Sequence, residues 1–344
     1  MTIYIFSEIN YNDNKHINQY LFDYLTENNE DCYFIERVTM KLPNKKNILR
    51  IIKSLFELNK SKGNGNGNGK VIKCNLLPPF RIFKALNQYK INKLIDKNKK
   101  SSIISFVPHE HIFNFKHNNN YYYYCVHDST QQGFTRKIRD FEQKLIKNKY
   151  TTVLCDNENV MNKLALEYEV YPNFTNSNLA ILMPPPVPDD FFNIPSIDKY
   201  KYDFCYYGSF HHDIDIDIIL ELSKKYKILI ISNNPDNNLR NNANILIIDA
   251  IFDMKILANT INQSKYLLLP YKNSEFMNTI TPAKAYQVQA FNKPILCSNR
   301  YLSKKYNFET HVENLHNKQC YKVDQSLSTS EVSKFILNII KIKS

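Results

Sequence analysis

The sequence predicts an α/β protein of two doubly wound domains, each a parallel sheet with helices on both faces. Three observations support this prediction. Short apolar runs alternate with stretches of helical periodicity, which is typical of strand–helix–strand units. Prolines cluster at 184–188, and a second series of apolar runs follows them. Because clustered prolines continue neither a helix nor a central strand, they indicate a domain boundary.

The first strand is expected at Thr2–Phe6, an apolar run that leads through a polar loop into a helix with apolar residues from Ile17 to Tyr24. Strand, loop and helix in this order form the repeating unit of a parallel sheet. Further apolar runs predict strands at 32–35, 71–74, 103–107, 121–126 and 152–155.

The second half of the chain repeats this alternation after the proline cluster. Its apolar runs predict strands at 203–207, 227–231, 245–248, 266–269 and 294–297. Helical periodicity predicts helices near 214–225, 253–263, 282–291 and 330–341. The two series predict two α/β domains of similar size with a cleft between them.

Two segments of the first half carry other signals. The stretch 45–60 is basic and amphipathic, which fits either a helix packed on the sheet or contact with an anionic membrane surface. The glycines and asparagines of 63–69 form a low-complexity segment. It lacks the G-x-x-x-x-G-K-S/T pattern and the preceding strand of a phosphate-binding loop, so we expect a flexible insertion.

Composition and charge exclude several classes of protein. The chain has 344 residues, with 45 Lys+Arg against 33 Asp+Glu and a net charge of +12, which favours an anionic partner. No apolar run is long enough to span a bilayer, and the first residues do not resemble a signal peptide. The seven cysteines form no C-x-x-C pair, which argues against a zinc knuckle or a disulfide scaffold. We therefore expect a cytoplasmic protein, either free or peripheral at a membrane.

The segment 266–297 is the most informative for chemistry. An apolar strand leads through a loop to Pro282, which suits the first turn of a helix. The free backbone N–H groups of such a helix start attract a phosphate, and Lys284 adds a positive charge for the same anion. The alternative is that Lys284 is a solvated helix residue.

At this point the sequence resembles the GT-B glycosyltransferases, which have two Rossmann-like domains facing a central cleft. YYGSF at 206–210 resembles the turn after the first strand of their nucleotide-sugar domain. PY at 270–271, PAKAYQ at 282–287 and NKPIL at 292–296 resemble the block that binds the donor. Within this fold the chain is most similar to bacterial exopolysaccharide and teichuronic-acid transferases and to the xanthan-type β-glucuronosyltransferase.

The first half carries matching pieces, LPP at 77–79 with LN at 86–87, and YCVHD at 124–128. The resemblance implies an acceptor-binding domain at 1–185, a nucleotide-sugar domain at 186–328, and a C-terminal helix at 329–344 that packs back on the first domain. It also implies a hexosyl- or glucuronosyl-transferase that uses a UDP-sugar, acts on a glycan or lipid-linked acceptor in polysaccharide biosynthesis, and has no other cofactor.

The resemblance assigns the donor site residue by residue. Retaining members carry two glutamates, whereas here Glu275 is followed by Ala283 at the usual distance, with Gln287 in place of the second glutamate. This departure favours inversion of the anomeric centre. The implied donor-binding residues are Gly208, Ser209, Tyr271, Glu275, Thr281, Pro282, Lys284 and Gln287.

Asp128 is the candidate catalytic base, because it follows a strongly apolar strand and ligands bind at the carboxyl ends of strands in open sheets. The alternative role is an N-cap for a following helix, and His127 is an alternative base. His109 and His111 follow another strand and are expected, with His127, to contact the acceptor. Backbone N–H groups around Gly208 and the charge of Lys284 would then meet the leaving diphosphate, so no metal is expected.

Two other patterns are given structural interpretations. Asp213, Asp215 and Asp217 imitate a D-x-D metal motif, but they precede a helix, where solvated carboxylates favour the helix dipole. The sequence His109-Glu110-His111 lacks the spacing that places two imidazoles on one helical face.

Two other functions remain open on the sequence. A nucleic-acid-binding protein would use the positive charge and the tyrosines, but it needs a basic groove and the lysines here are scattered. A sugar-nucleotide epimerase of the same architecture would act on the nucleotide sugar without an acceptor.

Overall fold

Side chains alternate between the two faces of the first strand, β1 (Thr2–Phe6), and every one of them is buried. Ile3 and Ile5 face one hydrophobic cluster, whereas Tyr4 and Phe6 belong to another. Because neighbouring side chains of a strand point to opposite faces, β1 is the centre of a sheet that is covered on both sides.

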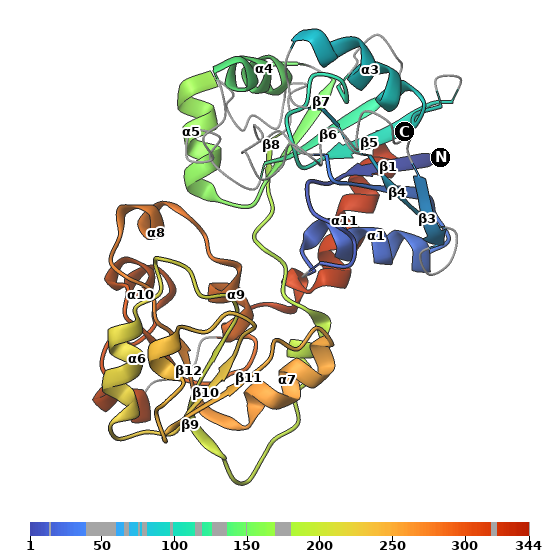
Figure 1. Cartoon of the computed structure of the whole chain (residues 1–344). Helices are drawn as coiled ribbons and strands as arrows, with labels where there is room; N and C mark the ends of the chain where they lie inside the picture. The colour runs from blue at the N-terminus through green and yellow to red at the C-terminus, as the bar shows by residue number, and fades with distance from the viewer. Residues whose placement is uncertain are drawn as a thin grey trace. The chain divides into compact units, whose positions relative to one another are not determined.

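The computed structural model forms two units, Met1–Pro184 with Ser330–Ser344 and Pro185–Thr329, here called the N-terminal and C-terminal units (Figure 1). The structure describes residues 1–13, 15–38, 60–64, 69–74, 76–77, 81–96, 99–113, 119–125, 136–148, 150–168, 180–317 and 322–343.

The N-terminal unit contains an eight-stranded sheet in the order β3-β4-β2-β1-β5-β6-β7-β8. Neighbouring strands are parallel except for β3 and β4, which are antiparallel. The strands after β1 are β2 (Asp31–Glu36), β3 (Lys60–Asn64), β4 (Lys70–Lys73), β5 (Ser101–Ser105), β6 (Asn120–Cys125), β7 (Thr151–Cys155) and β8 (Ala180–Leu182).

Helices cover both faces of this sheet. On the face of Ile3 and Ile5 lie α1 (Ile17–Glu27) and α11 (Thr329–Ile342), and Leu21 and Ile336 share one cluster with those strand residues. The opposite face is covered by α3 (Lys84–Asn92), α4 (Arg136–Ile146) and α5 (Glu158–Tyr168). Among the described residues, short 3-10 helices lie at Arg81–Phe83, Asp189–Phe191, Asn237–Leu239, Val312–Asn317 and Gln325–Leu327.

The glycine-rich segment differs from the sequence prediction. Gly63 and Asn64 are the last residues of β3, so they are not part of a loop. This edge strand is held by backbone hydrogen bonds to β4, which need no apolar side chains. At the other end of the segment, a Cβ on Gly69 would lie 2.0 Å from Cγ2 of Thr26 on α1, so only glycine fits. Of the amphipathic stretch 45–60, residues 45–59 lie outside the described residues.

The C-terminal unit contains a parallel sheet in the order β11-β10-β9-β12-β13 around one hydrophobic cluster. Its strands are β9 (Tyr202–Tyr207), β10 (Ile228–Ile231), β11 (Ile245–Ile248), β12 (Ser264–Leu269) and β13 (Ile295–Cys297). Its helices are α6 (Ile216–Ser223), α7 (Met254–Asn262), α8 (Glu275–Thr279), α9 (Ala283–Gln289) and α10 (Arg300–Tyr306). Of these, α8 and α10 were not predicted.

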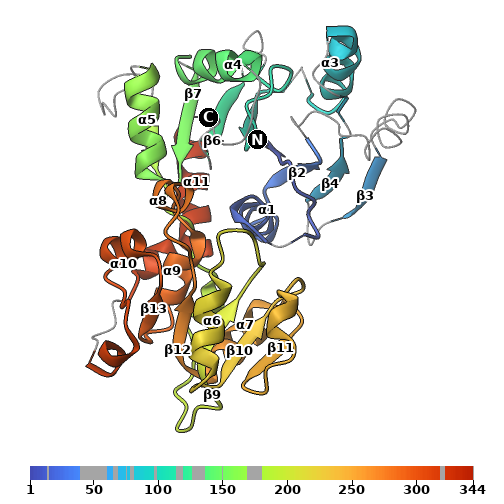
Figure 2. The same cartoon turned by 60° about the vertical axis from the view of Figure 1, so that its left-hand side comes forward.

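Each sheet has one point at which the strand order changes direction. In the N-terminal unit β1 lies between β2 and β5. In the C-terminal unit, whose strands β9 to β13 are labelled in Figure 2, β9 lies between β10 and β12. The segments that follow the two strands at such a point leave toward opposite faces, and ligands of doubly wound sheets bind there. The fold therefore directs attention to the segments after β1 and β5, and to those after β9 and β12.

The described residues include no helix with the length and apolar character that crossing a membrane requires.

Candidate functional site

The candidate site lies in the C-terminal unit, where the segments after β9 and β12 meet. Ile214 and Tyr271 form an antiparallel β-bridge between the two segments. Next to it, the N–H of Asp215 donates to the carbonyl of Pro270 at 2.7 Å. These backbone contacts fix both segments at the switch point of the sheet.

Gly208 and Lys284 are in direct contact at this site. Gly208 follows β9 with a φ of +119°, a conformation that L side chains rarely adopt. A Cβ on Gly208 would lie 2.0 Å from Nζ of Lys284, so the missing side chain makes room for the ammonium group. The same Nζ is 5.5 Å from the ring centre of Tyr206 and 5.8 Å from that of Tyr207.

The ammonium group of Lys284 has no ion-pair partner among the described residues. Burial lowers the pKa of Lys284 from 10.5 to about 8. A partly buried cation without a carboxylate is costly to keep, and such groups are frequent at binding sites. The arrangement suits an anionic ligand.

One detail of the sequence-based site needs correction. The N–H of Gly208 donates to the carbonyl of Ile231 at 2.9 Å, so it is committed to the neighbouring strand and does not point to a phosphate. The role of this glycine is the space that it leaves for Lys284. The helix α9 begins one residue after Pro282, and Lys284 is its second residue.

The other predicted donor-site residues lie in several environments. Gln287 accepts a hydrogen bond of 3.0 Å from the hydroxyl of Tyr207, which joins α9 to the end of β9. The carbonyl of Ser209 accepts from the hydroxyl of Tyr206 at 2.8 Å. The remaining predicted residues are the buried Tyr271, the exposed Glu275 at the start of α8, and the partly exposed Thr281.

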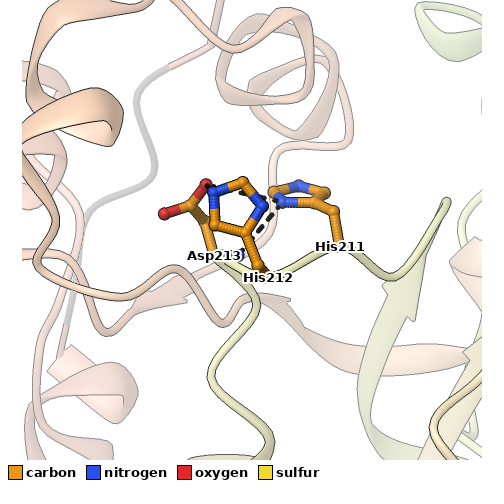
Figure 3. A group of neighbouring side chains, drawn as sticks. All are labelled: His211, His212 and Asp213. Atoms are coloured by element: carbon orange, nitrogen blue, oxygen red, sulfur yellow. Dashed lines mark hydrogen bonds and ion pairs between the residues drawn. The ribbon is translucent and has the colours of Figure 1, made fainter.

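Asp213 was not recognised from the sequence as a site residue. It was expected to be a solvated residue at a helix start, but it is only 3% exposed. Its Oδ1 accepts a hydrogen bond of 2.7 Å from the hydroxyl of Ser274, and its Oδ2 lies 2.8 Å from Nε2 of His212 (Figure 3). The residue that caps α6 is Asp215, whereas Asp213 lies two residues earlier, outside the helix, and contacts Ser274 instead.

The ring of His211 stacks on Tyr271 with a centroid distance of 6.4 Å and an interplanar angle of 27°. Burial, and after it the nearby charge of Lys284, lowers the pKa of His211 below its usual 6.5. The imidazole is therefore neutral at pH 7.

In the N-terminal unit, His109 and His111 follow β5 at the switch point and are both 4% exposed. Nδ1 of His109 accepts from the N–H of His111 at 3.2 Å, and Nδ1 of His111 is 2.8 Å from Oε1 of Gln88. Burial lowers the pKa of His109 to about 3. These contacts give both rings a structural role, and their contact with an acceptor stays a prediction.

Asp128 and His127 lie outside the described residues, which end at Cys125 after β6 and resume at 136. The neighbouring strand β7 ends next to Asp156, whose N–H is 3.4 Å from the carbonyl of Cys125. Burial raises the pKa of Asp156 well above its usual 3.8. Asp156 follows an apolar strand just as Asp128 does, so the same signal could have identified it.

Comparisons with known proteins agree with this architecture. No protein-family model matches the chain, and no curated protein matches it in sequence. Among solved structures, it is similar to the GtfA/B complex (TM-score 0.60, 9% identity, 100% of this chain and 99% of that chain). It is also similar to HepE of Anabaena in complex with UDP (TM-score 0.58, 8% identity, 99% and 100% covered). A third similar structure is WaaG, a glycosyltransferase involved in lipopolysaccharide biosynthesis (TM-score 0.55, 10% identity, 98% and 90% covered). The chain therefore has the α/β GT-B fold, which confirms the predicted fold class.

Proposed function

We propose that the protein is a glycosyltransferase that moves a sugar from a UDP-sugar to a glycan or lipid-linked acceptor. The GT-B fold supports this proposal, and HepE, which has this architecture, was solved with UDP. A trehalose-6-phosphate protein of E. coli, of similar fold with a TM-score of 0.53, was solved with UDP-2-fluoro glucose.

The contact between Lys284 and Gly208 is the observation that carries the proposal. It holds a cation without an acidic partner among the described residues at the switch point of the C-terminal sheet. When the bond between sugar and diphosphate breaks, negative charge develops on the departing diphosphate. Lys284 is the group that stabilises this charge, so the step as proposed requires neither a metal nor a cofactor.

We further propose that the transfer inverts the anomeric centre. The acceptor hydroxyl gives its proton to the carboxylate of Asp128, and its oxygen forms the new bond to the anomeric carbon. The bond from that carbon to the diphosphate oxygen breaks, and its electron pair leaves with UDP. Gln287, hydrogen-bonded to Tyr207, replaces the glutamate typical of retaining enzymes of this fold.

For a glucuronic acid donor, the sugar carboxylate would need a cation in addition to the one that holds the diphosphate. Lys272 is exposed, and its Nζ is anchored 2.9 Å from the carbonyl of His212 beside the candidate site. We propose that Lys272 serves this role. An acceptor at a membrane surface would be reached through the basic stretch 45–60, in a cytoplasmic enzyme of polysaccharide biosynthesis.

The donor site is tested by titrating the protein with UDP, GDP and UDP-sugars while following thermal unfolding and binding heat. We expect UDP to stabilise the wild type, and Lys284→Ala to lose most of that effect. Lys255→Ala, which changes an exposed lysine on α7, should behave like the wild type. The proposal fails if no nucleotide binds, or if Lys284→Ala binds UDP with unchanged affinity.

The base is tested separately with Asp128→Asn. We expect this variant to bind UDP normally and to lose UDP release in the presence of lipid-linked or glycan acceptors, because general-base catalysis contributes about 10²–10⁴-fold to a rate. A variant that retained full turnover would exclude Asp128 and direct attention to Asp156 and His127.

A further inference from the structure

Three side chains of the segment after β9 bring metal-ligand atoms together (Figure 3). One ring nitrogen each of His211 and His212 and a carboxylate oxygen of Asp213 all lie within 4.8 Å of one another. Oδ2 of Asp213 is 2.8 Å from Nε2 of His212 and 3.8 Å from Nδ1 of His211. Two ligand atoms that are each about 2.0–2.1 Å from one ion lie roughly 2.9 to 3.4 Å apart. The distance from Asp213 to His212 is close to this range, whereas the ring of His211 must move toward the ion to reach it.

The carboxylate of Asp213 is the independent observation that points to a ligand. It is only 3% exposed, and no donor among the described residues forms an aligned hydrogen bond to its Oδ2. Its nearest ionisable partner is the exposed ring of His212, at 2.8 Å, and a buried carboxylate oxygen without an aligned hydrogen bond is costly. The hydroxyl of Ser274 donates to the other oxygen, Oδ1, at 2.7 Å, which orients the carboxylate in the way that outer partners orient metal ligands.

We infer that His211, His212 and Asp213 form a binding site for a divalent first-row transition metal ion such as Zn²⁺. Two imidazole nitrogens and one carboxylate oxygen suit zinc and its neighbours, whereas Mg²⁺ and Ca²⁺ prefer a shell of oxygen ligands. With three protein ligands, further coordination positions are left to water or a bound anion.

The metal can enter with small rearrangements. Nδ1 of His211 accepts the N–H of Asp213 at 3.3 Å, a long hydrogen bond that a metal bond to the same lone pair would replace. The side chain of His212 is 84% exposed, so its ring can turn toward the ion without disturbing packing.

The charge of Lys284 opposes a cation at this place, and the carboxylate of Asp213, which is a ligand in the proposed site, offsets this repulsion. The glycosyl transfer proposed above uses Lys284 and leaves this cluster unassigned, so metal binding does not depend on that function.

The test is a competition for Zn²⁺ between the full chain and a chromophoric chelator, followed by the visible absorption of Co²⁺ bound to the protein. We expect one ion per wild-type chain and an affinity that falls at least about tenfold in His212→Asn. Ser274→Ala should weaken binding less. His311→Asn, which changes an exposed histidine of the same unit, should bind like the wild type.

Equal Zn²⁺ affinity in the wild type and His212→Asn would overturn the inference, as would a wild-type chain that takes no metal from the chelator. Displacement of Co²⁺ by Mg²⁺ at similar concentration would overturn the assigned class of metal. Because His212 is exposed, its substitution leaves the fold intact, and circular dichroism checks this.

Discussion

The substitution Gly208→Ala tests whether this glycine exists to make room for Lys284. The new Cβ would lie 2.0 Å from Nζ and 2.4 Å from Cε of Lys284. A lysine end is flexible, so we expect the ammonium group to move away and leave the anion site. A φ of +119° at an alanine adds strain of about 1–3 kcal/mol, which lowers the melting temperature by about 2–4 °C per kcal/mol.

The loss in UDP affinity follows from the displaced charge. A hydrogen bond between a charged group and its partner contributes about 1.5–3 kcal/mol, so Gly208→Ala should weaken UDP binding roughly 10- to 100-fold. Lys284→Ala should weaken it by a similar factor. In the double variant the two effects should not add, because both remove the same contact.

Isothermal titration of UDP into the wild type, the two single variants and the double variant measures this coupling. Thermal denaturation of the four proteins separates two effects of the alanine. The double variant keeps the backbone strain at position 208, but it lacks the clash between the new Cβ and the side chain of Lys284. Additive losses of UDP affinity would refute the proposed contact, and so would wild-type affinity in Gly208→Ala.

Three further predictions concern charge and packing. Burial lowers the pKa of Lys284 from 10.5 to about 8, so between these pH values the unfolded state binds more protons than the folded state. The buried charge therefore destabilises the fold below pH 8, and the free energy of unfolding rises as the pH increases from 8 to 10.5. Denaturant unfolding at pH 7 and pH 10 should therefore show a stability gain in the wild type that is smaller in Lys284→Met by up to about 3 kcal/mol, and equal gains would contradict the burial of the charge. Ile336→Ala on the buried face of α11 should lower the free energy of unfolding by about 2–5 kcal/mol. Phe335→Ala, at a side chain that is 48% exposed, should lower it little, and equal losses would contradict the orientation of α11. Asn87→Ala should cost roughly 2–4 kcal/mol, since Asn87 is bonded to both the N–H and the carbonyl of Leu77 at 2.9 and 3.0 Å, and an unchanged denaturation midpoint would show that these groups find other partners.

Most strands were predictable because their apolar side chains determine where they begin and end. Apolar runs such as 203–207 and 266–269 correspond to β9 and β12 with shifts of one or two residues at their ends. β3 has the sequence KSKGN, in which no apolar alternation exists, and it is a strand only because β4 offers it hydrogen-bond partners. The five residues of α8 are too few to show a helical period.

The sequence predicted which residues form the candidate site better than it predicted how they contact one another. The turn at Gly208 and the position of Lys284 at the start of α9 were expected from local sequence. Their mutual contact depends on how β9 and α9 pack, which no local pattern contains. For the same reason the burial of Asp213 was missed, because Ser274, its partner, comes from the segment after β12.

The position of α11 has a consequence for folding during synthesis on the ribosome. Ile3 and Ile5 are synthesised long before α11, yet part of the apolar surface that covers their face, including Ile336 and Ile340, belongs to α11. At about 5–20 residues per second, roughly 15 to 70 s of synthesis separate the two. The C-terminal unit is continuous in sequence and can finish folding in that interval. During the same time, one apolar face of the N-terminal sheet lacks the helix α11 that covers it in the folded protein. A chaperone that shields apolar strands is therefore expected to bind the nascent chain before residue 330 is made.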